Sequence, residues 1–272
     1  MFFTNLFLNI RLWFHIKIFK SVFLKNNRKE RKIDWSLTFK DYFRTLNRSI
    51  WRTDAYYGSR YHPESIENHG EAPKVYYGDD SFKMYNSKLA LLCERKSTIV
   101  HHKNYGKYSI PYKIGQLDSS NYFKQKYGYF ELRCKMPNAP AHWPAFWLAS
   151  TYDWPPEIDI FESYTTKNGF NSISTNVHWS DFFEDRKMKP KKHTVLPINK
   201  GFHLYACEWD KNYIKFYYDN LLIRKEKTPE NYYWPMHIII NQSVEKKHID
   251  LLHNKTFPSE FILDYVRAYK KN

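Results

Sequence analysis

The chain has 272 residues, of which 42% are apolar, and this is enough to bury either one large core or two small ones. Its net charge of +15 suggests nucleic-acid binding, yet the sequence has no zinc-ligand spacing, no RNA-binding aromatic motif and no basic helix beyond the first thirty residues. We therefore expect only weak, non-specific association with nucleic acid. The three cysteines, an odd number, predict buried thiols rather than a disulfide framework.

Residues 1–32 have a composition of their own. They hold eight Lys and Arg residues against a single acid, and apolar residues recur among them at helical spacing. The charges interrupt every apolar run before it reaches the length of about 20 residues that a bilayer-spanning helix requires. The segment also lacks the order of a secretory signal, in which charges come first, then an unbroken apolar stretch and then small residues at a cleavage site. We predict an N-terminal appendage, either an interfacial amphipathic helix that touches a membrane surface or an atypical leader.

From residue 33 to residue 272 the pattern changes to short strands separated by turns. Residues 33–39 and 88–94 are strand-like, and residues 213–223 predict two strands joined at Asp219-Asn220. Helical periodicity and internal repeats are absent from this part of the sequence. Many short antiparallel strands over about 240 residues predict a single all-β domain built as a large β-sandwich.

Residues 143–148 (Trp-Pro-Ala-Phe-Trp-Leu) predict a strand with one aromatic face. Alternation places Trp143 and Trp147 on one face, and Phe146 and Leu148 on the other. Two tryptophans on one face are compatible with ordinary core packing and also with a flat platform for sugar rings. Their position shortly before a strand of acids favours the platform.

That acidic strand comprises residues 157–162 (Glu-Ile-Asp-Ile-Phe-Glu). Glu157 and Asp159 point to one face, and the two isoleucines point to the other. Strict alternation would send Glu162 to the isoleucine face, whereas one extra residue, a β-bulge, returns it to the acidic face. Residues 167–169 (Lys-Asn-Gly) predict a hairpin turn directly after this strand.

The bulge decides which chemistry the two glutamates can perform. With it, the Glu157 and Glu162 Cα atoms lie ~13 Å apart, and side chains that lean inward by roughly 4 Å each leave about 5 Å between the carboxyl groups. That gap suits a retaining glycosidase, whereas an unbulged gap of ~8 Å would leave room for the water of an inverting enzyme. Asp159 would keep the pKa values of the two glutamates apart. The alternative is an edge strand whose acids simply face water.

Six segments together resemble glycoside hydrolase family sixteen, the retaining β-glycanases with a concanavalin-A-like jelly roll. The similarity runs in register from about residue 35 to residue 269. The six segments are Tyr127–Arg133, His142–Leu148, Glu157–Glu162, Thr175–Trp179, Gly201–Trp209 and Leu263–Tyr269. The resemblance implies a jelly-roll β-sandwich with an open cleft on its concave face. It also implies Glu157 as the nucleophile, Asp159 as its electrostatic helper and Glu162 as the general acid/base.

The extra residue in the acidic strand is similar to that of laminarinases, agarases and carrageenases, and differs from the shorter form of lichenases and xyloglucan transglycosylases. We therefore expect retaining endo-hydrolysis of β-glycosidic bonds in a β-1,3-glucan or a galactan. Two alternatives stay open at this point. One is a transglycosylase that acts on the same glycans, and the other is a non-catalytic carbohydrate-binding sandwich.

The resemblance further implies six residues that bind substrate: Trp143, Trp147, His178, Trp179, Asn176 and Asn241. The first two would form the floor of the cleft, on which sugar rings stack. His178 would hydrogen-bond a sugar hydroxyl or an acid, or else serve as a structural histidine, and Asn176 shares its face. Trp179 lies on the opposite face unless the strand bends.

Basic residues gather after the strand of His178: Arg186, Lys187, Lys189, Lys191 and Lys192. Such a run usually faces only solvent. At the rim of a cleft it would instead attract the sulfate or carboxylate groups of a galactan.

The expected reaction requires no cofactor, and no metal is predicted among the catalytic residues. The family resemblance allows a structural calcium ion away from the cleft, for which the sequence nominates no ligands. We expect a polysaccharide as the partner and a monomer as the assembly state. The substrate class alone indicates a secreted or cell-surface location.

Overall fold

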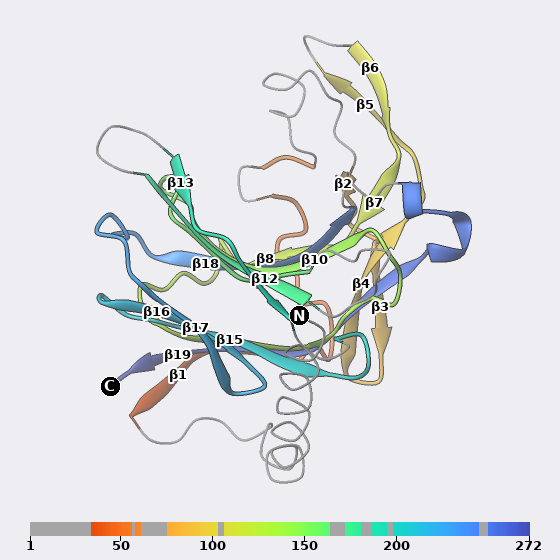
Figure 1. Ribbon diagram of the computed structural model, residues 1–272. Coiled ribbons are helices and arrows are strands. Elements are labelled where there is room, and N and C mark those ends of the chain that lie inside the picture. The colour runs from red at the N-terminus through yellow and green to blue at the C-terminus, as the bar shows by residue number, and fades with distance from the viewer. Residues whose placement is uncertain are drawn as a thin grey trace, which may run out of the picture.

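The computed structural model describes residues 34–55, 58–60, 75–102, 106–163, 172–180, 186–194, 198–244 and 250–272. This part is almost entirely β-structure, in two large sheets that stack face to face (Figure 1). The prediction of an all-β sandwich is therefore confirmed. The predicted appendage and the predicted turn at residues 167–169 lie outside the described residues. In the part of the chain that is described, no helix has the length and apolarity to cross a membrane.

The larger sheet has ten strands. Its main path runs in the order β17 (Leu221–Lys227), β16 (Tyr213–Tyr218), β15 (His203–Trp209), β9 (Gly128–Lys135), β19 (Ser259–Lys271), β4 (Lys88–Glu94), β7 (Tyr112–Ile114) and β2 (Val75–Tyr77). Off this path, β1 (Trp35–Asp41) pairs with β19, and β3 (Phe82–Tyr85) pairs with β4. Only the short β2–β7 pair is parallel among these described strands.

The smaller sheet has seven strands and carries the acids. Its order is β13 (Arg186–Met188), β12 (Ser172–Ser180), β11 (Glu157–Glu162), β10 (His142–Ser150), β18 (Met236–Val244) and β8 (Gln116–Asp118), with β14 (Lys191–Thr194) also paired with β12. A separate hairpin joins β5 (Thr98–His102) to β6 (Gly106–Ile110), and a short 3-10 helix, η2 (Asn254–Thr256), precedes β19.

Several strands lie where alternation and turn residues predicted them. β4 covers residues 88–94 as expected, and β1 begins two residues later than predicted. The hairpin of β16 and β17 turns at Asp219 and Asn220, whose φ angles of 46° and 67° are both left-handed. Asp and Asn tolerate this conformation better than other residues with a side chain, which explains why the pair marks the turn.

The core fills the space between the two sheets. Phe161 of β11 is fully buried, and its ring centroid lies 4.2 Å from that of Tyr205 in β15 and 6.2 Å from that of Phe261 in β19. One side chain of the small sheet therefore packs against two strands of the large one. Burial of such a side chain contributes roughly 1.5–3 kcal/mol. The three cysteines are buried free thiols, as predicted.

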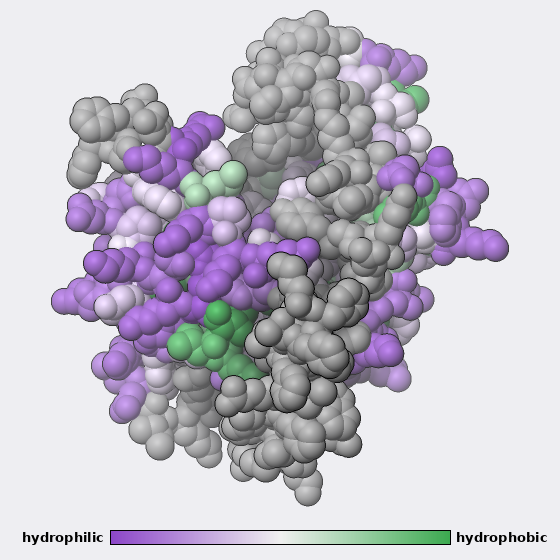
Figure 2. Space-filling view, in the orientation of Figure 1, coloured by the Kyte–Doolittle hydropathy of each residue, from purple (hydrophilic) through white to green (hydrophobic). Residues whose placement is uncertain are grey.

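The face of the seven-stranded sheet that points away from this core is the one available for ligands. On β10, Phe146 and Leu148 are buried in the core, while Trp143 and Trp147 on the other face stay half-buried, which confirms the predicted alternation. β13 stands above this face on one side, and the β5–β6 hairpin stands above it on the other (Figure 1). Hydrophilic side chains cover the edge where β13 and β16 lie (Figure 2).

Candidate active site

β11 carries the predicted bulge. Its pairing with β10 skips Ile160, because consecutive residues of β10 pair with Phe161 and Asp159. Its pairing with β12 also shifts between Asp159 and Glu162. Ile160 and Phe161 are consequently both buried in the core, although they are adjacent in an extended strand. The extra residue returns Glu162 to the outer face, which it shares with Glu157 and Asp159.

Glu157 lies among polar side chains. The Trp154 indole Nε1–H donates to its Oε2 at 2.9 Å. The His178 Nε2 atom lies 3.2 Å from Glu157 Oε1 and 3.1 Å from Asp159 Oδ2. Asn176 places its Nδ2 atom 2.8 Å from the same ring nitrogen. The indole N–H and a protonated His178 each stabilise negative charge on the Glu157 carboxylate.

Burial opposes this anion. Burial first, and the charge of Asp159 second, raise the pKa of Glu157 from 4.5 to about 8, although His178 and the Trp154 hydrogen bond act to lower it. Burial and the charge of Glu162 raise the pKa of Asp159 well above its ordinary value. Two adjacent buried carboxyls do not both ionise near neutral pH. With its pKa raised to about 8, Glu157 is ionised in only part of the molecules near neutral pH, and Trp154 and His178 favour that ionised form.

The second glutamate has a different environment. Glu162 accepts a hydrogen bond of 3.0 Å from Trp143 Nε1–H instead of from Trp154, and, like Glu157, it is partly buried. Trp147 donates its Nε1–H to Asn241 Oδ1, also at 3.0 Å. The two tryptophans on the outer face of β10 are therefore fixed by hydrogen bonds at one ring edge, and this holds their rings in defined positions near the acids.

The structure brings together most of the residues predicted to bind substrate. Asn176 and His178 lie directly opposite Asp159 and Glu157 across the β11–β12 pair, as expected from their shared face. Trp179 is the exception: it packs against the hydrophobic core. β12 keeps its alternation at this residue, so the indole lies on the face opposite the acids, as alternation predicted, and a sugar-binding role for Trp179 stays a prediction.

Two residues beside the acids escaped the sequence prediction. Trp154 is 37% exposed and lies three residues before Glu157, a spacing that could have signalled its role. Tyr232 is buried, and its hydroxyl lies 2.8 Å from the carbonyl of Glu157 and 2.7 Å from that of His178. It links the start of β11 to β12, and 54 or more residues separate it from either partner, so sequence alone offered no signal.

Exposed aromatic side chains extend the site at the end of the sheet where Glu157 lies. Tyr152 and Trp234 stack with ring centroids 4.9 Å apart, and they are 62% and 43% exposed. They flank the point where Ser150 and Met236 pair β10 with β18. Such a flat, exposed pair offers a second surface on which a sugar ring can stack.

The fit of a metal ion was tested on the described residues. Among them, one group of three potential ligands gathers, formed by Glu157, Asp159 and His178. Calcium prefers six to eight oxygen ligands, so two carboxyls and an imidazole do not suit it. A structural calcium ion elsewhere stays a prediction.

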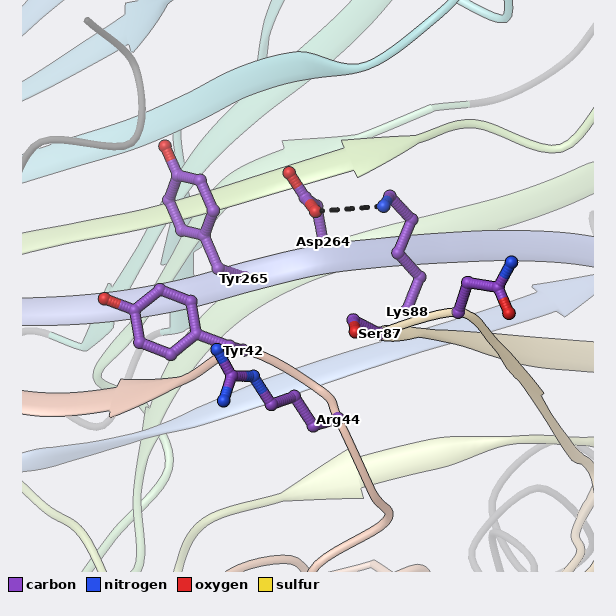
Figure 3. Close-up of a pocket in the computed structure, with 7 residues that line it drawn as sticks. Tyr42, Arg44, Ser87, Lys88, Asp264 and Tyr265 are labelled. Atoms are coloured by element: carbon purple, nitrogen blue, oxygen red, sulfur yellow. Dashed lines mark ion pairs between the residues drawn. The ribbon is translucent and has the colours of Figure 1, made fainter.

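A cavity of about 370 Å³ lies on the ten-stranded sheet, away from the acids, lined by Tyr42, Arg44, Asn86, Ser87, Lys88, Asp264 and Tyr265 (Figure 3). It has one lining carboxylate, Asp264, which forms ion pairs with Lys88 and Arg133. A carboxylate already paired with two cations is a poor calcium ligand. This cavity therefore supports neither the calcium expectation nor the catalytic chemistry of the acids.

Comparison with solved structures shows the fold. The laminarinase catalytic domain of Thermotoga maritima MSB8 superposes with a TM-score of 0.71 at 22% identity, covering 88% of this chain and 99% of that one. The κ-carrageenase of Pseudoalteromonas carrageenovora superposes with a TM-score of 0.71 at 20% identity, covering 91% and 99%. Both likenesses agree with the jelly-roll sandwich that the motifs implied.

Sequence comparison gives relatives with named activities. Endo-1,3-1,4-beta-glycanase ExsH of Rhizobium meliloti (strain 1021) is 31% identical over 159 residues, which is 58% of this chain and 33% of that protein. Keratan-sulfate endo-1,4-beta-galactosidase of Sphingobacterium multivorum is 24% identical over 172 residues, covering 59% and 41%. The chain thus spans about a third of the length of the first of these relatives. The family model for glycosyl hydrolases family 16 matches residues 70–244. The acidic strand, its bulge and this match lead to one conclusion: the chain belongs to glycosyl hydrolases family 16.

Proposed function

We propose that the protein is a retaining endo-β-glycanase that hydrolyses a polysaccharide of the β-1,3-glucan or galactan type. The observation that carries the proposal is the register shift of β11, which returns Glu162 to the face of Glu157. Membership of the family supports glycoside hydrolysis, and the names of the relatives, an endo-glycanase and an endo-galactosidase among them, support cleavage within a chain.

In the first step, the Glu157 carboxylate attacks the anomeric carbon and forms a covalent glycosyl-enzyme. The bond from that carbon to the glycosidic oxygen breaks, and Glu162 donates its proton to the departing oxygen. In the second step, Glu162 as the carboxylate takes a proton from water, and the oxygen of this water displaces Glu157 from the anomeric carbon. Two inversions at one carbon retain its configuration.

The neighbouring side chains act on the two glutamates in different ways. Trp154 and His178 contact the carboxyl of Glu157 and favour its ionised form. Burial and the charge of Asp159 oppose this ionisation. Trp143 orients Glu162 through its indole N–H. Double displacement requires Glu157 as the carboxylate and Glu162 as the carboxylic acid at the same time, and the different hydrogen-bond partners of the two glutamates support this division.

The proposal is tested with the isosteric variants Glu157→Gln and Glu162→Gln on a polysaccharide panel, scored for new reducing ends. We expect each to lower turnover by at least about a thousandfold, because each removes a reacting group, while the circular-dichroism spectrum stays that of the wild type. Near-normal hydrolysis by either variant would refute the assignment.

Azide distinguishes the two roles. With Glu157→Ala and a substrate carrying an activated leaving group, azide replaces the missing carboxylate, and we expect a glycosyl azide of inverted configuration. With Glu162→Ala, azide intercepts the glycosyl-enzyme, and we expect the retained configuration. The opposite pair of products would exchange the roles of the two glutamates.

The two alternatives have their own readouts. A transglycosylase transfers the glycosyl group to a sugar hydroxyl, so an added oligosaccharide acceptor would divert most of the product. A non-catalytic binder would retain glycan without releasing reducing ends. One relative, 30% identical over 129 residues, is named the beta-1,3-glucan-binding protein of Penaeus monodon. The presence of all three acids on one face favours catalysis over binding alone.

A further inference from the structure

The basic segment after β12 does not simply face solvent as a whole. β13 and β14 both pair with β12, and residues that lie opposite each other in a sheet share a face. Arg186 lies opposite Ser180, and Lys192 lies opposite Ser174. These serines alternate with core residues and lie on the same face as His178. Arg186 and Lys192 are therefore directed to the face of the sheet that carries the acids.

The other cations of the segment have different positions. Lys187 lies opposite Trp179 and Lys191 opposite Thr175, both on the core-facing side of β12. Lys189 forms an ion pair of 2.6 Å with Glu226. Strand pairing and alternation therefore direct two of the five basic residues to the face that carries the acids, and the other three elsewhere.

Arg186 lies close to the nucleophile. Its guanidinium carbon is 4.8 Å from the ring centroid of Trp154, the same indole that donates to Glu157. Stacking holds a cation over an exposed aromatic ring while its N–H groups stay available. Among the described residues, no acid forms an ion pair with Arg186.

Lys192 lies in line with the acid/base. Glu162 pairs with Ser174 on β12, and Ser174 pairs with Lys192 on β14, so the three residues form one row across adjacent strands. At a spacing of about 4.8 Å per strand, the Cα atoms of Glu162 and Lys192 are about 10 Å apart. Lys192 is exposed, and the described part of the chain supplies no acidic partner for it.

A buried arginine holds the connection between β13 and β14 in place. Arg224 of β17 is 3% exposed and donates to the carbonyl of Thr175 at 2.8 Å and to that of Lys189 at 2.7 Å. The Lys189 backbone N–H in turn donates to Val177. The ten-stranded sheet therefore anchors the connection between β13 and β14, and the directions of the two flanking cations follow from a hydrogen-bonded framework.

We propose that Arg186 and Lys192 bind anionic substituents of the glycan, sulfate or carboxylate, at positions on either side of the acids, so that the natural substrate is an acidic polysaccharide. This rests on the proposed glycanase function and specifies its substrate class. An arginine fork suits bidentate recognition of either oxyanion, and a lysine supplies a point charge. Beside a neutral glucan, two cations that have no acidic partner among the described residues would have no such function.

The chain offers a matched control for the test. Lys192→Gln and Lys191→Gln make the same charge change one residue apart, but on opposite faces of the sheet. Arg186→Gln removes the other cation. Hydrolysis is measured with a sulfated galactan, a carboxylated β-glycan and a neutral β-1,3-glucan. We expect Lys192→Gln and Arg186→Gln each to lower the ratio of acidic to neutral kcat/KM by about tenfold, mainly through KM, and Lys191→Gln to leave this ratio within twofold of wild type.

The two acidic polymers distinguish sulfate from carboxylate as the recognised group. Binding of acidic oligosaccharides to the inactive Glu157→Gln protein, by titration calorimetry at low and high salt, provides a second readout that needs no turnover. We expect affinity to fall with salt, and the loss to be smaller in Lys192→Gln. A wild type that prefers the neutral glucan, or a Lys192→Gln variant that behaves as Lys191→Gln does, would overturn the inference and leave the glycanase function standing. Full activity of Glu157→Gln would instead overturn the function.

Discussion

Replacing Glu157 with Gln should stabilise the protein at alkaline pH while it removes activity. Burial and Asp159 raise the pKa of Glu157 from 4.5 to about 8. A carboxyl with a raised pKa in the folded state contributes its full stability below pH 4.5, where it is protonated in both states. This contribution is lost as the pH rises toward and through 8, because the unfolded chain ionises more readily.

The magnitude follows from the shift. Each pKa unit corresponds to about 1.4 kcal/mol, so the ionisation of Glu157 costs the fold at most on the order of 5 kcal/mol above pH 8. For a domain of this size, 1 kcal/mol moves Tm by about 2–4 °C. Gln keeps the shape of the side chain and an oxygen that accepts from Trp154, but never ionises. We therefore expect Glu157→Gln to raise Tm by about 5–15 °C at pH 9.

The assay is thermal unfolding followed by circular dichroism from pH 4.5 to pH 9. The Tm difference between Glu157→Gln and wild type should be close to zero at pH 4.5 and should grow steadily with pH. Glu230→Gln makes the same change at an exposed residue and serves as the control. A Tm difference that is independent of pH, or that shrinks as the pH rises, would refute the burial argument.

Three further changes test the contacts around the acids. Trp154→Phe removes the indole N–H that donates to Glu157, so kcat should fall roughly tenfold to a hundredfold. The acid limb of the kcat/KM pH profile should move to higher pH, because the hydrogen bond that lowers the pKa of Glu157 is lost. An unmoved limb would contradict this role. Tyr232→Phe withdraws the hydroxyl from the carbonyls of Glu157 and His178, and we expect a loss of about 1–2 kcal/mol in urea denaturation; a value near zero would argue against the link between β11 and β12. Arg224→Met leaves the buried carbonyl of Thr175 and the part-buried carbonyl of Lys189 without their donor. We expect a loss of about 2–4 kcal/mol in the same assay, and an unchanged midpoint would show that the anchor is dispensable.

The β-sandwich was predictable because strand patterning is local. Alternation along β10 separated the core residues Phe146 and Leu148 from the two outer tryptophans, and the structure keeps that separation. The bulge in β11 was predictable as well, since three acids and three apolar residues in six positions cannot be sorted onto two faces by strict alternation. In both cases the information lies within one strand.

The surroundings of the acids depended on contacts between segments far apart in the chain. Tyr232 reaches the start of β11 only when β18 and β11 occupy the same sheet. The pKa shift of Glu157 could not be predicted from sequence either, because burial is its largest cause and burial depends on the packed fold. Alternation along β12 placed Trp179 on the face opposite the acids, and the structure agrees, because the indole packs against the core.

The sequence by itself determined which residues could perform the chemistry: two glutamates and an aspartate on one face of a bulged strand, with tryptophans on the strand before it. Only the tertiary structure decided how the pKa values of these acids are shifted and on which face of the sheet the cations lie. Alternation is a property of one strand, whereas the direction of Arg186 and Lys192 depends on which strand each one pairs with and in what register. Register between distant segments is set by the whole packed core, and no single stretch of the chain encodes it.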